Sequence, residues 1–442
     1  MDIMSDKNDE AARQKAAEGQ QASIPMAPQD RRRAFLVLTI GLMCTGFSQS
    51  VVYAILPPIA RDLGLSEMQV GSIFVLSSLF WVLTTPWWGR RSDKLGRKLS
   101  VLIGLFGFSL SMLLFTLTLQ AAQAKWLTIG AAFPILILTR SLYGLIVSAA
   151  NPSAQAYVAD RTTRDERTRA VATIGAAYGL GATIGPGLSA SLVILGILVP
   201  FYFCVLLGLL SAALIWRYLP EKERPLPAHA KVKLRLFDRR IVLNLVNGGL
   251  MSSAQAIMIQ TVAFYMMDRL SLPLDHAAQY AGIGLMAASM AALFGQLVIV
   301  HRFRMSAPVL ERSGLLIAAG AFLAMAFADQ IGPLVFALTM IGLGQGMARP
   351  GNVAVASLIV RRHEQGAIAG LNNATNAFGF LIMPFIAMPA YKLDPSLPYL
   401  IGAGLLFVAM VISVADPNAR MAASKAGEHY EPDDMDDPAR PL

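Results

Sequence analysis

Charged residues are scarce in this chain of 442 residues. Asp, Glu, Lys and Arg together make up 15% of it, whereas hydrophobic residues make up 55%. Several uncharged stretches exceed the twenty or so residues that would cross a lipid bilayer, and a soluble core needs no such stretches. This composition excludes an ordinary soluble enzyme. It predicts a protein that crosses a membrane many times.

Cysteine is almost absent, since the chain has only Cys44 and Cys204, and both lie in apolar runs. A thiol in such a place behaves as a small hydrophobic group, so we expect neither a disulfide nor a metal site. The phosphate-binding, zinc-protease and serine-hydrolase motifs are also missing, which argues against an enzyme and against a bound cofactor. The net charge of +9 forms no basic stripe interleaved with aromatic residues, so no nucleic-acid partner is expected.

The apolar runs predict twelve transmembrane helices in an all-α membrane protein. The run 170–216 is long enough for two spans, with a turn near Gly196 and Pro200. Arg140 and Arg349 each interrupt one otherwise uncharged run. The runs are 34–60, 68–89, 99–124, 126–159, 170–216, 241–267, 277–300, 313–328, 330–360, 365–391 and 395–415.

Basic residues between the runs predict the orientation in the membrane. The loops on one side hold 22 Lys and Arg, whereas those on the other side hold four. Cytoplasmic loops carry the excess of such residues, so both termini are expected in the cytoplasm and the chain in the cytoplasmic (inner) membrane. Residues 1–33 contain no apolar signal-peptide core, so the first apolar run is expected to direct insertion.

A charged, proline-rich loop divides the predicted helices six against six. Residues 1–33 and the acidic tail 416–442 have the polar composition of disordered segments. The expected organisation is a disordered cytoplasmic tail at 1–33, a six-helix bundle at 34–219, a linker at 220–240, a second six-helix bundle at 241–415 and an acidic cytoplasmic tail at 416–442.

The two bundles also repeat one another in sequence. A shift of 198 residues brings Asn151-Pro152 onto Arg349-Pro350, Gly144 onto Gly342, Gly181 onto Gly379 and Pro186 onto Pro384. Duplicated halves with a substrate held between them near the middle of the bilayer are typical of secondary transporters.

The segment Gly89-Arg-Arg-Ser-Asp93-Lys-Leu-Gly96-Arg97-Lys98 follows the second predicted helix. It resembles the cytoplasmic signature of the major facilitator superfamily, although Arg91 stands where the family usually has an apolar residue. The two glycines suit a tight turn, and the single carboxylate can bind the surrounding cations. The resemblance implies a fold of two pseudo-symmetric six-helix bundles and a gating role for Gly89, Asp93, Gly96 and Arg97.

A second motif lies in the fifth predicted helix. Gly181-Ala-Thr-Ile-Gly185-Pro186 resembles the motif of the twelve-helix drug/proton antiporter group, which would give Gly181, Gly185 and Pro186 a part in gating. Glycines four residues apart let helices approach closely, and a proline bends a helix. The motif ends in Ser189-Ala190 instead of two glycines, which weakens the assignment to exporters.

Asp and Glu are absent from the interiors of all twelve runs, and the five histidines lie outside them or at their ends. A proton antiporter is expected to carry such a titratable group inside the membrane. Two possibilities stay open. Protons could be coupled through residues nearer the helix ends, namely Asp62, Asp268 or Glu311, or there could be no proton coupling at all.

Two arginines do lie inside the runs. With helices at 131–158 and 333–360, Arg140 and Arg349 fall within about 7 Å and about 4 Å of the helix midpoints. An arginine there keeps its charge and must face water, a carbonyl or an anion. Arg140-Ser-Leu-Tyr-Gly144 also resembles the family's helix-4 signature, whose arginine ties helices together, so both a structural and a substrate role stay open.

Polar residues at helical spacing accompany these arginines and suggest a hydrated central pathway. Hydrogen bonding between helices is the alternative explanation for each of them. The residues expected to line a substrate cavity are Arg349, Arg140, Gln49, Asn151, Asn352, Gln255, Asn376 and Tyr53.

The sequence therefore predicts a secondary transporter that works by alternating access, moving a small amphiphilic or anionic organic compound, with export preferred. Uptake or exchange of an organic anion is the first alternative, and a membrane sensor that no longer transports is the second. The expected partners are the small-molecule substrate, a coupling proton or other ion, and the lipid bilayer, and the chain is expected to be a monomer.

Overall fold

The computed structural model describes residues 28–162, 164–220, 238–299, 302, 305–360 and 364–417. These residues form two compact units. The first unit contains the described residues of 1–229 together with 262–286, and the second contains those of 230–261 and 287–442. Most of the predicted linker 220–240 lies outside the described residues, so the expected boundaries stay a prediction.

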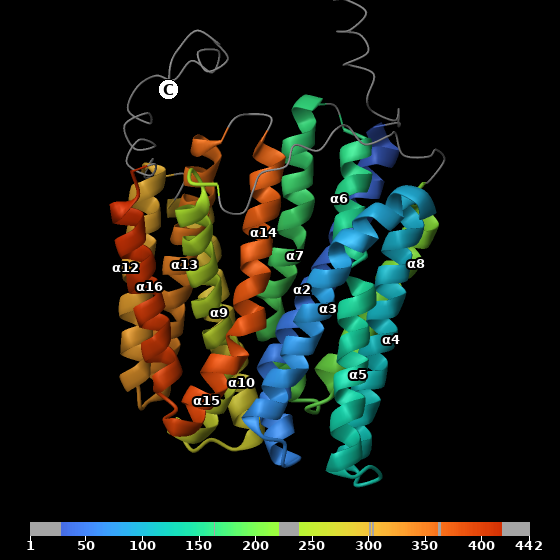
Figure 1. Ribbon diagram of the computed structural model, residues 1–442. Helices are drawn as coiled ribbons and strands as arrows, with labels where there is room; N and C mark the ends of the chain where they lie inside the picture. Colours follow the sequence, from blue (N-terminus) through green and yellow to red (C-terminus); the bar gives the residue numbers. More distant parts are fainter. Residues whose placement is uncertain are drawn as a thin grey trace, which may run out of the picture. The chain divides into compact units, whose positions relative to one another are not determined.

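Helices make up nearly all of the described chain, and these residues contain no β-strand (Figure 1). The helices of the first unit are α2 (Pro28–Asp62), α3 (Glu67–Leu95), α4 (Arg97–Gln123), α5 (Ile129–Val147), α6 (Ala150–Asp160), α7 (Arg164–Val193) and α8 (Val199–Tyr218). Two helices contribute residues to both units, namely α9 (Val242–Arg269) and α10 (Leu274–Phe294). The second unit adds the π-helical turn η1 (Gly295–Ile299) and the helices α12 (Ala307–Phe327), α13 (Ile331–Ile359), α14 (Gln365–Ile382), α15 (Pro384–Leu393) and α16 (Leu397–Ala415).

Eleven helical stretches among the described residues are long and apolar enough to cross a membrane. The remaining predicted span corresponds to α7, whose 30 residues exceed the length a bilayer requires but include more polar positions. Gly196 lies in the turn between α7 and α8 with a φ of +139°, a backbone conformation that favours glycine. The predicted all-α membrane fold is therefore confirmed.

Proline accounts for two interruptions of these helices. Pro152 has no amide hydrogen for the carbonyl of Ser148, and the helix breaks there between α5 and α6. Pro384 has the same effect between α14 and α15. Both breaks fall on residues that the sequence repeat singles out.

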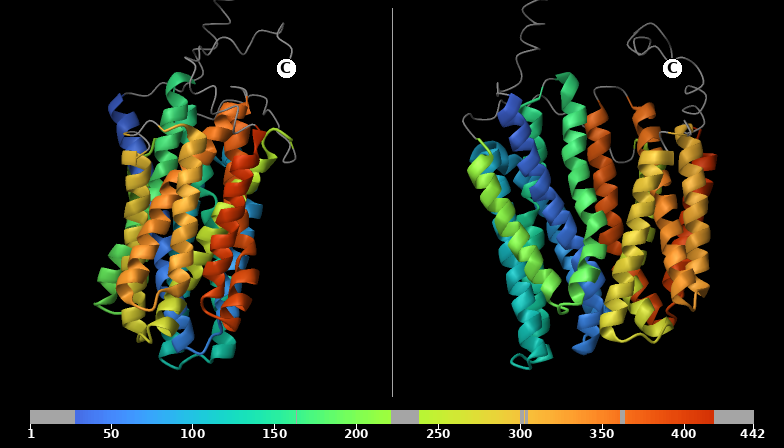
Figure 2. Two further views of the ribbon diagram at one scale, coloured as in Figure 1. Left: turned by 90° about the vertical axis from the view of Figure 1, so that its left-hand side faces the viewer. Right: turned by 180° about the vertical axis from the view of Figure 1, so that it is seen from behind.

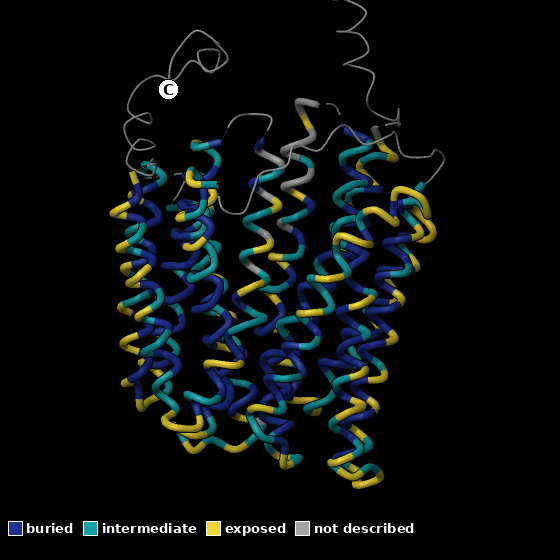
Figure 3. The backbone as a smooth tube through the Cα atoms, in the orientation of Figure 1, coloured by how far each residue is buried: buried dark blue, intermediate teal, exposed yellow. Residues whose placement is uncertain are grey.

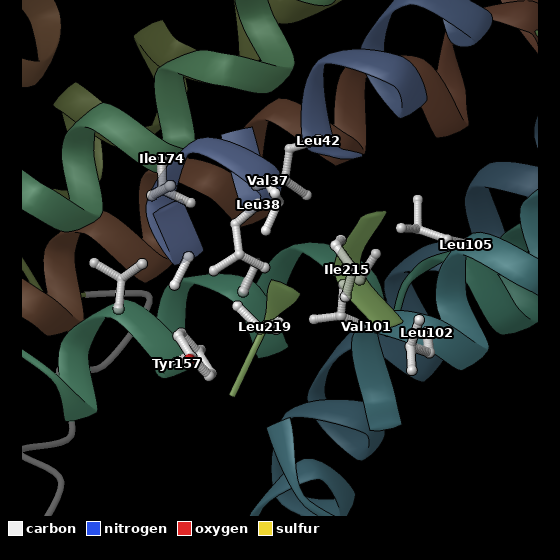
Figure 4. Packing of buried hydrophobic residues seen from close by; sticks show 14 of the residues in the cluster. Val37, Leu38, Leu42, Val101, Leu102, Leu105, Tyr157, Ile174, Ile215 and Leu219 are labelled. Carbon is white, nitrogen blue, oxygen red and sulfur yellow. The ribbon is translucent and has the colours of Figure 1, made fainter. Parts of the chain in front are cut away.

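Buried apolar side chains hold the first unit together near one end of its helices (Figure 4). Leu38 of α2, Leu105 of α4 and Ile215 of α8 are each fully buried in this cluster. Tyr157 of α6 and Ile174 of α7 join it, so five helices share one core. In the bilayer such a core gains stability from close packing, because lipid tails are themselves apolar.

Large apolar side chains also lie on the outside of the helices. Leu138 of α5 is 67% exposed and Phe407 of α16 is 62% exposed. Figure 3 shows exposed positions along the length of the helices of each unit, and not only at their ends. This pattern suits helices that face lipid tails.

The two halves of the sequence repeat the same helix packing. In the first unit α4 packs against α5 and α8, and in the second unit α12 packs against α13 and α16. α2 and α7 also lie side by side (Figures 1 and 2). A Cβ atom on Gly181 of α7 would clash with the carbonyl oxygen of Met43 on α2, and one on the repeat-related Gly379 would lie 2.6 Å from the carbonyl carbon of Ser252 on α9. The repeat therefore preserves contacts as well as residue types.

An ion pair is repeated as well. Arg31, at the start of α2, donates from Nη1 to Glu166 Oε2 of α7 at 3.0 Å. Arg240, just before α9, donates to both carboxylate oxygens of Glu364, just before α14, at 3.1 and 3.2 Å. A shift of 209 residues relates the two arginines, and the shift of 198 relates the two glutamates. Each half thus ties the start of its first helix to the start of its fifth.

Candidate functional site

Arg349 lies on α13, on the helix face that packs against α9. Its Nη2 donates to Gln255 Oε1 at 2.6 Å and to Ser252 Oγ at 3.4 Å. Its Nε is buried without a hydrogen-bond partner among the described residues. One turn away on either side, Gln345 donates to the Met251 carbonyl at 3.4 Å and Asn352 bonds to α9 as well. The predicted polar stripe on α13 therefore faces α9.

Arg140 has a similar partner in the first unit but a more enclosed environment. Its Nη2 donates to Gln49 Oε1 of α2 at 2.5 Å, and its guanidinium carbon lies 4.0 Å from the ring centroid of Tyr143. The residue is only 2% exposed, whereas Arg349 is partly exposed. A cation over an aromatic face is a stabilising arrangement in itself. The structure thus favours a structural role for Arg140.

No described carboxylate forms a salt bridge with Arg140 or with Arg349. Both arginines bond a neutral glutamine instead, so their charge is solvated by dipoles but not neutralised. The two arginine–glutamine pairs are not related by the repeat. A shift of 198 residues takes Arg140 to Leu338, and a shift of 209 takes Gln49 to Met258. Each half therefore pairs an arginine with a glutamine at positions that the other half does not use.

The other predicted cavity residues divide between the two units. Tyr53 is buried in the first unit with its ring centroid 4.7 Å from that of Phe74. Asn151 accepts a hydrogen bond from Gln155 at 2.9 Å, within α6. Asn352 donates to the Asn244 carbonyl at 3.1 Å and accepts at its own carbonyl from Asn244 at 2.8 Å. The side chain of Asn376 lies outside the described part of the chain.

The signature segment between α3 and α4 forms a small ionic cluster. Asp93 pairs with Arg97 at 2.6 Å, and Arg97 also donates to Asp160 of α6 at 3.1 Å. Gly96 has a φ of +97°, so the turn between α3 and α4 falls there. The expectation that Gly89 also forms the turn was wrong, because α3 continues as a helix through Gly89 to Leu95.

The exporter-like motif packs α7 onto α2. A Cβ on Gly181 or on Gly185 would come closer than 3 Å to backbone atoms of Met43 or Phe47 on α2. Pro186 lies within α7, and the helix continues past it to Val193. The motif residues therefore permit a close contact between α7 and α2, and their part in gating stays a prediction.

Glu311, one of the three carboxylates that the sequence places near helix ends, is buried in the second unit. Because α12 begins at Ala307, the helix includes Glu311, which is 1% exposed. The uncharged run began only at 313, and the helix continues past that limit. Three neutral side chains donate to Glu311, namely Asn247, Asn352 and Ser413.

A second ionic cluster also escaped notice. Arg61, at the end of α2, donates to Glu67 of α3 at 2.6 Å and to Asp268 of α9 at 2.5 Å. Its guanidinium carbon lies 4.9 Å from the ring centroid of Phe264. All four residues belong to the first unit, so the end of α9 is held to the ends of α2 and α3. Sequence spacing alone gives no signal for such a contact.

Comparisons with known proteins agree with this architecture. Multidrug resistance protein 1 of Bacillus subtilis (strain 168) is 25% identical over 393 residues, covering 86% of this chain and 95% of the relative. The quinolone resistance protein NorA of Staphylococcus aureus (strain COL) is 22% identical over 398 residues, covering 88% of this chain and 97% of the relative.

Two solved structures share the fold. The human organic anion transporter MFSD10 (TETRAN) covers 88% of this chain and 100% of its own with a TM-score of 0.60 and 18% identity. A bacterial homologue of the human lysosomal transporter Spinster, inward-facing and occupied, covers 91% of this chain and 97% of its own with a TM-score of 0.64 and 15% identity. The sequence model of the Major Facilitator Superfamily matches residues 38–384. The chain therefore belongs to this superfamily of multi-pass membrane transporters, and it is a transporter and not an enzyme.

Proposed function

We propose that this transporter carries a small amphiphilic organic anion across the cytoplasmic membrane, with export as its direction. The observation that carries the proposal is Arg349, a partly exposed arginine in a membrane-spanning helix, with no described carboxylate partner and an unpartnered Nε. An organic anion offers the acceptor that this guanidinium lacks. The planar fork of arginine suits a carboxylate or sulfonate.

Polar residues around Arg349 support this assignment. Ser252 and Gln255 hold Nη2 from α9, which fixes the orientation of the guanidinium. Binding sites gain specificity from a few such oriented groups in mostly apolar surroundings. The apolar side chains of the membrane-spanning helices suit the rest of an amphiphilic molecule.

The direction of transport rests on the relatives. Two of them are named as multidrug and quinolone resistance proteins, and export of a drug is one way in which a membrane transporter confers resistance. Uptake or exchange of an organic anion is the second candidate, supported by the two membrane arginines and by the name of the fold relative MFSD10 as an organic anion transporter. We further propose that both termini are cytoplasmic and that the protein works as a monomer.

Proteoliposomes test the substrate class. The purified protein is reconstituted, pH gradients and membrane potentials of either sign are imposed, and the movement of aromatic sulfonates and of quaternary ammonium compounds is followed. The proposal expects movement of the anions and not of the cations. Transport of the cations alone would contradict it.

A further inference from the structure

The end of α8 carries an exposed patch of basic and aromatic side chains. This α8 patch consists of Trp216, Arg217 and Tyr218. Trp216 is 71% exposed, Tyr218 is 48% exposed and Arg217 is exposed as well. The guanidinium carbon of Arg217 lies 5.3 Å from the ring centroid of Tyr218. Neither the family assignment nor the transport of an anion requires these side chains at this point.

Lys98, near the start of α4, fixes this end of α8. Its Nζ donates to the Trp216 carbonyl at 2.8 Å. The helices α4 and α8 lie side by side in the first unit (Figures 1 and 2). A lysine can bind the last carbonyls of a helix whatever the side chains there, so this tie requires only the backbone of α8. The side chains of the α8 patch take no part in it.

The second unit has the same tie without the patch. Arg312, near the start of α12, donates to the Ser413 carbonyl near the end of α16 at 2.7 Å. The chain continues there with Val414, Ala415 and Asp416. When the two ties are aligned, the three residues of the α8 patch correspond to serine, valine and alanine. Helix packing therefore does not account for the patch, and it needs another explanation.

The length of α8 places the patch at the boundary between lipid tails and headgroups. The helix Val199–Tyr218 has 20 residues, or about 30 Å, which matches the hydrocarbon core of a bilayer. Its last turn therefore lies at headgroup level, where Trp and Tyr are enriched. Leu206, Leu209 and Leu210, earlier on α8, are 44% to 53% exposed, and Leu99 of α4 is 45% exposed. Acyl chains can thus cover the surface beside the patch.

Arg217 brings a positive charge to headgroup level. No described carboxylate forms an ion pair with it. A guanidinium binds phosphate through two parallel hydrogen bonds, and the hydroxyl of Tyr218 can donate another. A zwitterionic lipid carries its own cation beside the phosphate, whereas an anionic lipid does not, so an unneutralised arginine favours the anionic lipid.

We propose that the α8 patch is a binding site for an anionic phospholipid, with Arg217 and Tyr218 at the phosphate and Trp216 beside the upper part of the acyl chains. The site lies in the leaflet on the side of the loop 220–240. The corresponding end of α16 has no such site, because it lacks both the cation and the aromatic rings. Binding of the lipid involves no transported substrate, so its test is independent of the proposed function.

Tryptophan fluorescence of the full-length protein in lipid nanodiscs tests the headgroup preference. The nanodiscs contain phosphatidylglycerol and phosphatidylcholine with the same chains, and bromine atoms, which quench tryptophan, are placed on the chains of one lipid or of the other. The signal of Trp216 is the difference between the wild type and Trp216→Phe. Phosphatidylglycerol should be favoured beside Trp216 about fivefold, which corresponds to about 1 kcal/mol for one basic residue. Equal quenching by the two brominated lipids would overturn the proposal.

Variants of Arg217 separate a specific site from the general positive charge of the loops. Arg217→Gln should abolish the preference for phosphatidylglycerol, whereas Arg217→Lys keeps the charge and should retain most of it. Arg239→Gln, which removes an exposed arginine just before α9, is the matched control and should keep the full preference. Salt at about 0.5 M should weaken the preference of the wild type, because the charge lies at the water boundary. A preference that persists in Arg217→Gln would also overturn the proposal.

Discussion

Arg349 donates to Gln255 at 2.6 Å while its own Nε lies buried without a partner among the described residues. The glutamine orients the guanidinium but leaves its charge unneutralised. Arg140 is bonded to Gln49 in the same way, but it is 2% exposed and lies over the ring of Tyr143. The environment, and not the residue type, therefore distinguishes a candidate ligand contact from a structural cation.

The orientation prediction concerns the loop 220–240, most of which lies outside the described residues. In a background with Cys44 and Cys204 replaced by serine, Ala228→Cys should resist a membrane-impermeant thiol reagent in intact cells, because the basic loops are expected inside. Trp126→Cys is the matched control, since Trp126 is 84% exposed in a loop expected on the other side and should react readily. The reverse pattern of labelling would invert the proposed topology.

The close contact of α7 with α2 predicts a size-dependent effect. Gly181→Ala should destabilise the protein by about 1–3 kcal/mol, because the added methyl group would clash with the Met43 carbonyl. Gly179→Ala, two residues earlier on α7, has nothing within 4 Å of its Cβ position and should be neutral or slightly stabilising. Thermal unfolding of both variants in detergent compares them, and equal melting temperatures would show that the helices are further apart than described.

The repeated ion pairs predict unequal contributions to stability. Arg31 and Glu166 are 37% and 51% exposed, so breaking this pair should cost about 0.2–1 kcal/mol. Glu364 is 11% exposed and is held by two nitrogens of Arg240, so Glu364→Gln should cost more, up to about 2 kcal/mol. Double-mutant cycles on each pair measure the two couplings, and a stronger coupling for the exposed pair would contradict the prediction.

Asp238 adds a pH dependence to the second pair. Its hydrogen bonds from Arg240 hold the pKa of this carboxyl below its ordinary value. A carboxyl group whose pKa is lower in the folded state contributes stability above its unfolded pKa and loses it as the pH falls through the folded one. Asp238→Asn should therefore reduce the loss of stability on acidification below about pH 4, and the effect should be small because the group is largely hydrated.

Asp93→Asn should slow transport without preventing folding. The substitution removes the carboxylate that pairs with Arg97, but Arg97 keeps Asp160 and Ser92 as partners. By resemblance to the family loop, we expect transport about tenfold slower, equivalent to about 1.4 kcal/mol in the barrier, with a melting temperature close to that of the wild type. Arg90→Gln, an adjacent loss of charge outside the signature positions, should transport normally. Normal transport by both variants would remove the gating role from Asp93.

Much of the fold could be predicted from the sequence. A helix that crosses a bilayer needs a long uncharged run, and cytoplasmic loops carry more Lys and Arg than the loops on the other side. The repeat aligned Gly181 with Gly379, and the structure places both at close helix contacts. Helix ends were less predictable, since hydrophobicity marks only the part of a helix that lies in lipid. α2 accordingly begins at Pro28 and takes in three arginines that the run starting at 34 left out.

The candidate site could be predicted only in part. Arg349 and Arg140 were recognisable because a permanent charge inside an apolar run is costly, and so indicates a functional contact or a buried partner. Glu311 was recognisable only as a carboxylate near a helix end. Its burial was not predictable, because it lies two residues outside its run and becomes buried through contacts with α9, α13 and α16. The pair Arg61 and Asp268, 207 residues apart, gave no local signal at all.

The most direct test of the central claim is the affinity of purified Arg349 variants for an amphiphilic anion such as naphthalene-2-sulfonate, measured together with their melting temperatures. If Arg349 binds the anion, Arg349→Gln should keep its melting temperature within a few degrees of the wild type and lose most of its affinity, on the order of tenfold to a hundredfold. Arg349→Lys should bind at an intermediate level, because it keeps the charge but loses the two-donor geometry. Unchanged affinity in a folded Arg349→Gln protein would contradict the claim.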